Sequence, residues 1–292
     1  MNHLKKSLKI YPICCMKKIV NFTPTGTQPT RENSLAPLDV NEIVEEVIMA
    51  NELGISIVHL HAREGEGFVN TYKKDVYGKI IEGVRKYCPD LLVCTSLTGR
   101  NFPELEKRTE VLQCYPDMGS LTMSSLNFPT GASVNQPEMI LSLISEMDKY
   151  GVTPEIECFD SGMVNYTNYL IKKGILKGPF YMNVILGNIY NAQSDLTTVS
   201  SIRNSIGQDV TVCVGGIGGQ QLRSNILGLL EFDGVRVGLE DNLYYRGKEM
   251  ATNRMLLERI HRLMNEMEIE LMTSKELREN GYGNKLIDSR ER

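Results

Sequence analysis

The sequence of 292 residues has no tryptophan, only four histidines and no apolar run of the roughly 18 to 20 residues that a membrane-spanning helix needs. Its seven cysteines are odd in number and lack CxxC spacing, which argues against a disulfide framework and a thiolate zinc site. Lys and Arg (32) are fewer than Asp and Glu (36), so the chain lacks the concentrated positive field that binds nucleic acid or anionic membranes. These absences predict a soluble, cytoplasmic protein that acts on small molecules.

The two ends of the chain differ from its middle. Residues 1–15 carry no signal-peptide cleavage pattern, whereas Met16 opens KKIVNFTPTG, which is typical of a first buried strand. We therefore predict an N-terminal extension at 1–15, a catalytic domain at 16–280 and a polar C-terminal tail at 281–292. The content of 41% hydrophobic and 23% charged residues is that of an ordinary globular protein.

Short β-branched runs alternate with amphipathic stretches, the pattern of parallel strands joined by crossover helices. The predicted strands are 17–23, 56–61, 91–96, 119–123, 154–160, 181–186, 210–216 and 234–240. The predicted helices include 39–53, 74–87, 137–150 and 252–267, where apolar residues recur at three- and four-residue spacings. Eight such units predict a single (β/α)8 TIM barrel. A doubly wound open sheet is the alternative, although the turn at 25–27 is a weak match to the glycine-rich turn it requires.

Two histidines end the second predicted strand. His59 and His61 lie two residues apart, so both imidazoles project to the same face of the strand. In a (β/α)8 barrel the active site forms at the carboxyl ends of the strands, where a pair of imidazoles can bind one metal ion. A hydrogen-bonded pair of core histidines is the alternative.

Charged residues cluster at the ends of the eighth and fifth predicted strands. Arg236 and Glu240 share a face by the period of two, and Asp241 follows at the turn. Burying three charges is unfavourable unless they pair or bind something, which favours Glu240 as a third metal ligand and an Arg236–Asp241 pair. A structural ion pair is the alternative. Glu157 is an acid/base candidate, but alternation alone does not assign it to the lumen or the exterior.

Hydroxyl groups and glycines follow other predicted strands. Ser96 and Thr98 follow the third strand, and Ser120 and Thr122 lie in the fourth. They can orient substrate oxygens or simply cap helices. The run VGGIGG at 214–219 lacks the dinucleotide-binding spacing, but its place after the seventh strand suits a phosphate or thioester chain. Close packing of strand and helix explains these glycines equally well.

Seven motifs in this order resemble those of the β-keto acid cleavage enzyme family, over about residues 16–280. They are TPTGT (23–27), HLHAR (59–63), SLTG (96–99), SLNF (125–128), PEIECFDSGM (154–163), VGGIGG (214–219) and VRVGLEDN (235–242). The resemblance implies a zinc-dependent barrel, usually a homotetramer, with members in amino-acid catabolism. It further implies conversion of a β-keto acid and acetyl-CoA into acetoacetate and a new acyl-CoA.

The resemblance also implies site residues by position. Zinc would polarise the keto acid, and Asp241 beside Arg236 would remove a proton from C2. We therefore predict that the zinc ligands are His59, His61 and Glu240. The predicted catalytic residues are Asp241, Arg236 and Glu157. The predicted substrate-binding residues are Ser96, Ser120, Gln28 and Gly216.

The chain departs from the family pattern at two places. Residues 25–28 read TGTQ where a family member that cleaves an aminated substrate has TGAE, so the neutral Gln28 stands in place of a carboxylate. This change favours a neutral or anionic substrate over a cationic one. The second departure is the additional Leu97 in SLTG, where STG is common, which predicts a shifted third loop.

Two other functions compete with this interpretation. A metal-dependent barrel hydrolase also places HxH at a strand end, but it needs further histidines, and none occurs between His61 and His261. A barrel without catalysis that binds a metal or an acyl-CoA is the remaining possibility. The intact charged pair argues against it.

Overall fold

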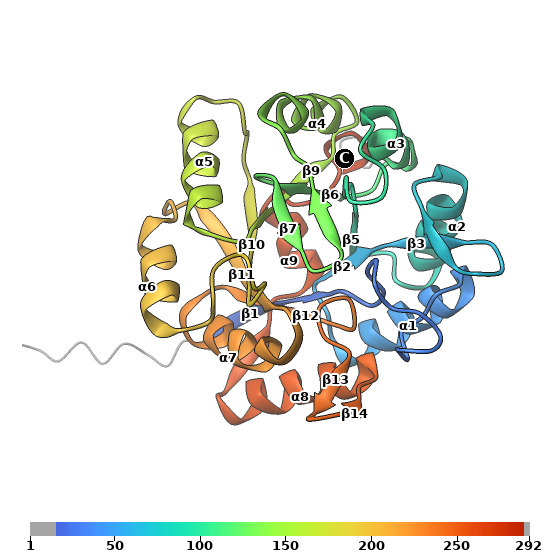
Figure 1. Cartoon of the computed structure of the whole chain (residues 1–292), viewed down its shortest axis with the longest axis vertical. Helices are drawn as coiled ribbons and strands as arrows, with labels where there is room; N and C mark the ends of the chain where they lie inside the picture. The colour runs from blue at the N-terminus through green and yellow to red at the C-terminus, as the bar shows by residue number, and fades with distance from the viewer. Residues whose placement is uncertain (1–15, 289–292) are drawn as a thin grey trace, which may run out of the picture.

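The computed structural model describes residues 16–288; the predicted extension at 1–15 lies outside the described residues. Eight parallel strands form a closed barrel because β12 pairs with β1 as well as with β11 (Figure 1). In spatial order the strands are β1 (Met16–Phe22), β2 (Ile57–Leu60), β5 (Leu92–Thr95), β6 (Met118–Thr122), β9 (Thr153–Cys158), β10 (Phe180–Leu186), β11 (Val210–Gly216) and β12 (Gly234–Val237). The predicted (β/α)8 barrel is confirmed, and closure excludes the open sheet.

Helices surround the barrel (Figure 1). They are α1 (Val40–Leu53), α2 (Lys74–Tyr87), α3 (Leu105–Thr109) with the 3-10 helix η1 (Glu110–Cys114), α4 (Pro137–Lys149), α5 (Ser161–Lys172), α6 (Leu196–Ser205), η2 (Gly218–Gln220) with α7 (Gln221–Glu231), and α8 (Asn253–Glu266). Asp39 caps α1 in a capping box with Glu42, and Thr252 caps α8. The four predicted helices therefore agree with the structure to within one residue at each end. None of the helices in residues 16–288 is long and apolar enough to cross a membrane.

Three hairpins follow barrel strands, and we did not predict them. They are β3 (Ala62–Glu64) with β4 (Val69–Thr71), β7 (Leu126–Phe128) with β8 (Gly131–Ser133), and β13 (Tyr244–Arg246) with β14 (Glu249–Met250). Each comes after the carboxyl end of a strand. The β7–β8 hairpin lies in front of the barrel strands in Figure 1, on the face where a TIM barrel carries its active site.

The alternation along β9 decides which side chains enter the barrel. Glu155 accepts hydrogen bonds inside the barrel from Asn21 of β1 and Asn183 of β10. Ile156 and Cys158 instead join the apolar core that also includes the buried faces of the helices. Glu155 and Glu157 therefore face the lumen, which alternation alone left open.

The C-terminal segment closes the amino-terminal end of the barrel. After β15 (Ile269–Leu271), which pairs with the start of β1, come α9 (Ser274–Glu279) and α10 (Lys285–Asp288); Figure 1 shows α9 in red behind the strands. Leu277 and Tyr282 pack into an apolar cluster with Ile19, Ile57 and other inward-facing residues of the strands. Asn284 is fully buried and donates to the backbone oxygens of Pro116 and Tyr150. Within the described part of the predicted polar tail, Tyr282 and Asn284 are thus buried against the barrel.

His261 in α8 gives a testable pH dependence of stability. It is partly buried beside Gly54, and burial lowers the pKa of the imidazole below its ordinary value. The unfolded chain therefore takes up a proton at higher pH than the folded chain, so stability should fall as the pH drops from about 7 through the folded pKa. Urea unfolding of His261→Gln at a series of pH values should show a shallower decline; an unchanged slope would contradict this assignment.

Candidate active site

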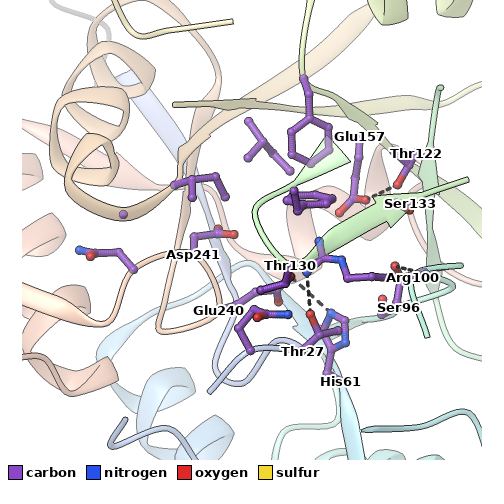
Figure 2. A pocket seen from close by; sticks show the side chains of 18 of the residues that line it. Thr27, His61, Ser96, Arg100, Thr122, Thr130, Ser133, Glu157, Glu240 and Asp241 are labelled. Carbon is purple, nitrogen blue, oxygen red and sulfur yellow. Dashed lines mark hydrogen bonds and ion pairs between the residues drawn. The ribbon is translucent and has the colours of Figure 1, made fainter. Parts of the chain in front are cut away.

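A cavity of about 370 Å³ opens at the carboxyl ends of the barrel strands. β2 and its end supply His59 and His61, β9 supplies Glu157, and the loop after β12 supplies Glu240 and Asp241. Figure 2 shows His61, Glu157, Glu240 and Asp241 around a common space. The structure therefore brings these sequence-predicted residues together from segments far apart in the chain.

His59, His61 and Glu240 form a group that can hold a metal ion. The Nε2 atoms of the two histidines are 3.3 Å apart, and His61 Nε2 is 3.3 Å from Glu240 Oε1. Ligands of a tetrahedral zinc ion with bonds of about 2.0 to 2.2 Å lie about 3.3 to 3.6 Å apart. Glu240 Oε2 is buried without a hydrogen-bond partner among the described residues, 3.9 Å from His59 Nε2. Two imidazoles and a carboxylate with one unsatisfied oxygen fit zinc.

Glu155 orients His59 from deeper in the barrel. Its Oε2 lies 2.5 Å from His59 Nδ1, and its Oε1 accepts from Asn21 and Asn183. Burial opposes ionisation of Glu155, but His59 and Arg236 outweigh it and hold the pKa at about 2. Burial likewise lowers the pKa of His59, yet the carboxylates of Glu155 and Glu240 raise it to about 9. An anionic partner at Nδ1 directs the other ring nitrogen of His59 toward the metal-ligand group.

Replacing Glu155 with glutamine tests this orientation. The Gln oxygen can still accept from the two asparagines, but an amide N–H facing His59 Nδ1 favours the tautomer protonated at Nε2, which cannot bind a metal. We expect zinc affinity to fall about 10- to 100-fold, measured by competition with a chelating dye. Glu104→Gln, which removes an exposed partner of Lys107, is the control. Equal affinity in the two variants would refute the role of Glu155.

Arg236 connects the carboxylates of the cavity. Its Nε donates to Asp241 Oδ2 over 2.9 Å, Nη2 to Glu240 Oε1 over 2.7 Å and Nη1 to Glu157 Oε1 over 3.2 Å. The guanidinium is 2% exposed, so three opposite charges offset its desolvation. Burial opposes the charge of Glu240, but Arg236 and His61 hold its pKa well below the usual range. For Asp241 and Glu157 burial outweighs Arg236 and raises the pKa.

Glu240 reaches this group by a different route from the one predicted. β12 ends at Val237, so the predicted strand 234–240 is three residues too long. Gly238 then adopts a φ of +156°, and a Cβ at this position would lie 2.1 Å from the backbone oxygen of Thr23. The close approach of two loops ends the strand and turns Glu240 toward Arg236. The period-two argument was therefore wrong for Glu240, although the residue lies where it was expected.

The four predicted substrate-binding residues divide into two pairs. Ser96 and Gln28 line the cavity. Ser120 and Gly216 are absent from its lining: Ser120 Oγ accepts from the backbone N–H of Leu97, and a Cβ at Gly216 would lie 2.5 Å from Ser224 Oγ of α7. Close packing thus explains Gly216. The additional Leu97 is buried, and the hydroxyl of Ser120 holds its backbone.

Sequence reasoning assigned no role to two charged residues near this site. Glu155 precedes Glu157 by two residues, so the same alternation could have indicated both once the lumen face was known. Arg100 follows the SLTG motif in a loop, and no periodic signal marks it. Thr122, noted only as a hydroxyl of the fourth strand, donates to Glu157 Oε2 over 2.8 Å.

A closed barrel with a metal-ligand group and buried carboxylates at the carboxyl ends of its strands defines a TIM-barrel enzyme. The chain matches the profile of the beta-keto acid cleavage enzymes over residues 17–280 and belongs to this family. The predicted family and enzyme class are confirmed.

Curated relatives span nearly the whole chain. A "3-keto-5-aminohexanoate cleavage enzyme" of Fusobacterium nucleatum is 34% identical over 268 residues, covering 90% of this chain and 97% of the relative. A "3-oxoadipate:acetyl-CoA acetyltransferase" of Cupriavidus necator is 32% identical, covering 85% of this chain and 88% of the relative. Among solved structures, ObcA in its binary complex with oxaloacetate superimposes with a TM-score of 0.70 at 18% identity, covering 85% of this chain and 67% of that chain, which shows a shared fold.

Proposed function

We propose that this chain is a zinc-dependent enzyme that combines a β-keto acid with acetyl-CoA and yields acetoacetate and a new acyl-CoA. One observation carries the proposal: the metal-ligand group and two buried carboxylates with raised pKa values share a single cavity. Family membership and the acetyl-CoA acceptor in the name of the Cupriavidus relative support the reaction.

His59, His61 and Glu240 would hold the zinc ion, which when bound would polarise the oxygens of the keto acid and lower the cost of removing the C2 proton. The chain prepares these ligands in advance. Glu155 fixes the ring of His59, and Arg236 holds Glu240 ionised. Burial lowers the pKa of His61 despite the nearby Glu240, which favours the neutral ring that metals require, whereas His59, with a pKa of about 9, would release its Nε2 proton on metal binding.

Asp241 is the base in this proposal. Burial raises the pKa of its carboxyl toward the working pH, which suits a general base, and the Arg236 Nε–H fixes its orientation. After proton removal, the C2 carbanion attacks the thioester carbonyl of acetyl-CoA and expels the CoA thiolate. The thiolate adds to the original C3 keto carbon, and cleavage of C2–C3 releases acyl-CoA. The remaining acetoacetate carbanion takes back the proton from Asp241.

Glu157 has a supporting role in the proposal. Its carboxyl accepts from Thr122 and Arg236, and burial raises its pKa. A carboxyl that is readily protonated can donate to the C3 oxygen as the thiolate adds and take the proton back as C2–C3 breaks. Ser96 and Gln28 line the cavity and contact the substrate in this proposal.

Acetoacetate formation by the zinc-loaded protein tests the proposal. Acetyl-CoA is supplied with β-keto acids that have cationic, neutral or anionic tails, and acetoacetate and acyl-CoA are quantified together. Equal amounts of the two products support the reaction. Release of free CoA without acetoacetate would favour a hydrolase, and no turnover with any tail despite bound zinc would favour a metal or acyl-CoA binding protein.

The resemblance further supports a homotetramer in the cytoplasm, with the β-keto acid and acetyl-CoA as its small-molecule partners. Sedimentation equilibrium on the full chain tests the tetramer. A single monomeric species at micromolar concentration would contradict it.

A further inference from the structure

Arg100 is a charged side chain on the cavity wall with no charged partner. Among residues 16–288 no carboxylate lies within ion-pair distance of its guanidinium, although Glu240, Glu157 and Asp241 all contribute to its electrostatic environment. A guanidinium carries five N–H donors and stays protonated in proteins. The structure shows one hydrogen bond from these donors, from Nη1 to Thr27 Oγ1 over 2.8 Å.

The guanidinium is nevertheless held in place. Its Cζ lies 3.7 Å from the centre of the Phe128 ring, a cation–π contact, while Thr27 fixes one edge. Its Nε atom is buried without a hydrogen-bond partner among the described residues. Figure 2 shows Arg100 extending from the third loop toward the middle of the cavity. A partly buried cation with unused donors, positioned by its neighbours, is arranged to receive an anion.

The other charges of the cavity are already engaged. Arg236 pairs with Glu157, Glu240 and Asp241, and Glu240 also contacts His61. The side chain of Gln28, next to Thr27, is a neutral amide, so it cannot form an ion pair with Arg100 or with a cationic substrate tail. Arg100 is thus the one charged group on the described cavity wall that remains for a part of the substrate outside the reacting atoms.

We propose that Arg100 binds a second carboxylate at the distal end of the substrate, so that the enzyme prefers dicarboxylic β-keto acids. The inference rests on the proposed function and deepens it by assigning the charge of the substrate tail. The reactive carboxylate and keto oxygens belong with the metal-ligand group and the Asp241–Arg236 pair. A planar guanidinium matches the two oxygens of a tail carboxylate, and the polar Ser96 and Thr98 also line this cavity.

A matched pair of six-carbon substrates tests the assignment. 3-Oxoadipate ends in a carboxylate and 3-oxohexanoate ends in a methyl group, while their reactive ends are identical. We expect the wild-type enzyme to favour 3-oxoadipate, and Arg100→Met to reduce the ratio of the two kcat/KM values about 30-fold, mainly through the KM for 3-oxoadipate. Arg100→Lys keeps the charge but loses the planar fork of N–H donors, so its ratio of kcat/KM values should lie between those of the wild type and Arg100→Met.

Arg31→Met is the control. Arg31 lies outside this cavity, where it contacts Glu42 and the Phe68 ring, and its removal lowers the net charge by the same amount. The control should keep the wild-type ratio. If Arg100→Met is poorly folded by circular dichroism, the ratio measured with Arg100→Lys decides.

Three results would overturn the inference. They are a wild-type preference for 3-oxohexanoate, an equal loss for both substrates in Arg100→Met, and a rise confined to the KM for acetyl-CoA, which would place the CoA phosphates at Arg100. Each of these leaves acetoacetate formation intact in the wild-type enzyme. If no β-keto acid of any tail charge gave acetoacetate, the proposed function itself would be refuted. Failure of the Arg100 assignment is therefore distinguishable from failure of the proposed function.

Discussion

Replacing His61 with alanine is expected to abolish tight zinc binding and to lower turnover by at least about 1000-fold. A Lewis acid stabilises the transition state by several kcal/mol, and the loss of about 4 kcal/mol corresponds to a roughly 1000-fold lower rate. Replacement of His61 tests the metal site more directly than replacement of His59. His59 is 1% exposed and faces Glu155, so its removal would leave a buried carboxylate without its imidazole partner. His61 contacts Glu240 and His59 at the cavity wall, and its loss should leave the fold intact.

Zinc content after dialysis and the acetoacetate rate measure this effect, with thermal unfolding as the test of folding. His261→Ala is the matched control, because that histidine lies in α8 outside the cavity. It should keep both zinc and turnover. Stoichiometric zinc with wild-type turnover in His61→Ala would remove His61 from the metal site.

Asp241→Asn is expected to lower kcat about 1000-fold, within the range of 100- to 10,000-fold for loss of a general base, while zinc affinity changes little. The asparagine oxygen can still accept from Arg236 Nε, so the geometry of the pair survives. Because burial raises the pKa of Asp241, the wild-type rate should climb as the pH rises through that pKa, where the carboxylate becomes available as base. The variant should lack this limb of the profile.

Exchange of the C2 protons in heavy water isolates the step assigned to Asp241. With the keto acid alone, the wild-type protein should exchange them faster than the buffer does, and Asp241→Asn should not. Glu157→Gln is the comparison, since it removes the other carboxyl of the cavity whose pKa burial raises. Wild-type exchange in Asp241→Asn together with its loss in Glu157→Gln would reverse the two roles.

The barrel and much of the site follow from local patterns, and the departures have physical causes. Period two places His59 and His61 on one face regardless of what lies around them. Glu240 depends on the turn at Gly238, where two loops approach too closely for a side chain. No local pattern contains that contact, because Thr23 lies more than 200 residues away in the sequence.

Glu155 and Arg100 show a second limit. Alternation gives Glu155 and Glu157 the same face, but only the neighbouring strands decide that this face is the lumen. Arg100 lies in a loop, where no period applies, and its role is inferred because no carboxylate of the described residues lies within ion-pair distance of it. The segment around Leu277 and Tyr282 reads as polar because two apolar side chains are too few to form a pattern, yet both close the barrel.

The closure of the amino-terminal end of the barrel by the C-terminal segment determines the order in which the fold assembles during synthesis. β1 pairs with β12 and, at its first residues, with β15, so the first strand acquires these partners only after more than 200 further residues have been synthesised. Leu277 and Tyr282 emerge later still. Contacts between the two ends of a chain slow folding. The nascent chain therefore keeps an open β1 edge and an uncovered apolar interior until residues 269–282 have been synthesised. Before that point it exposes the most surface to which a chaperone can bind.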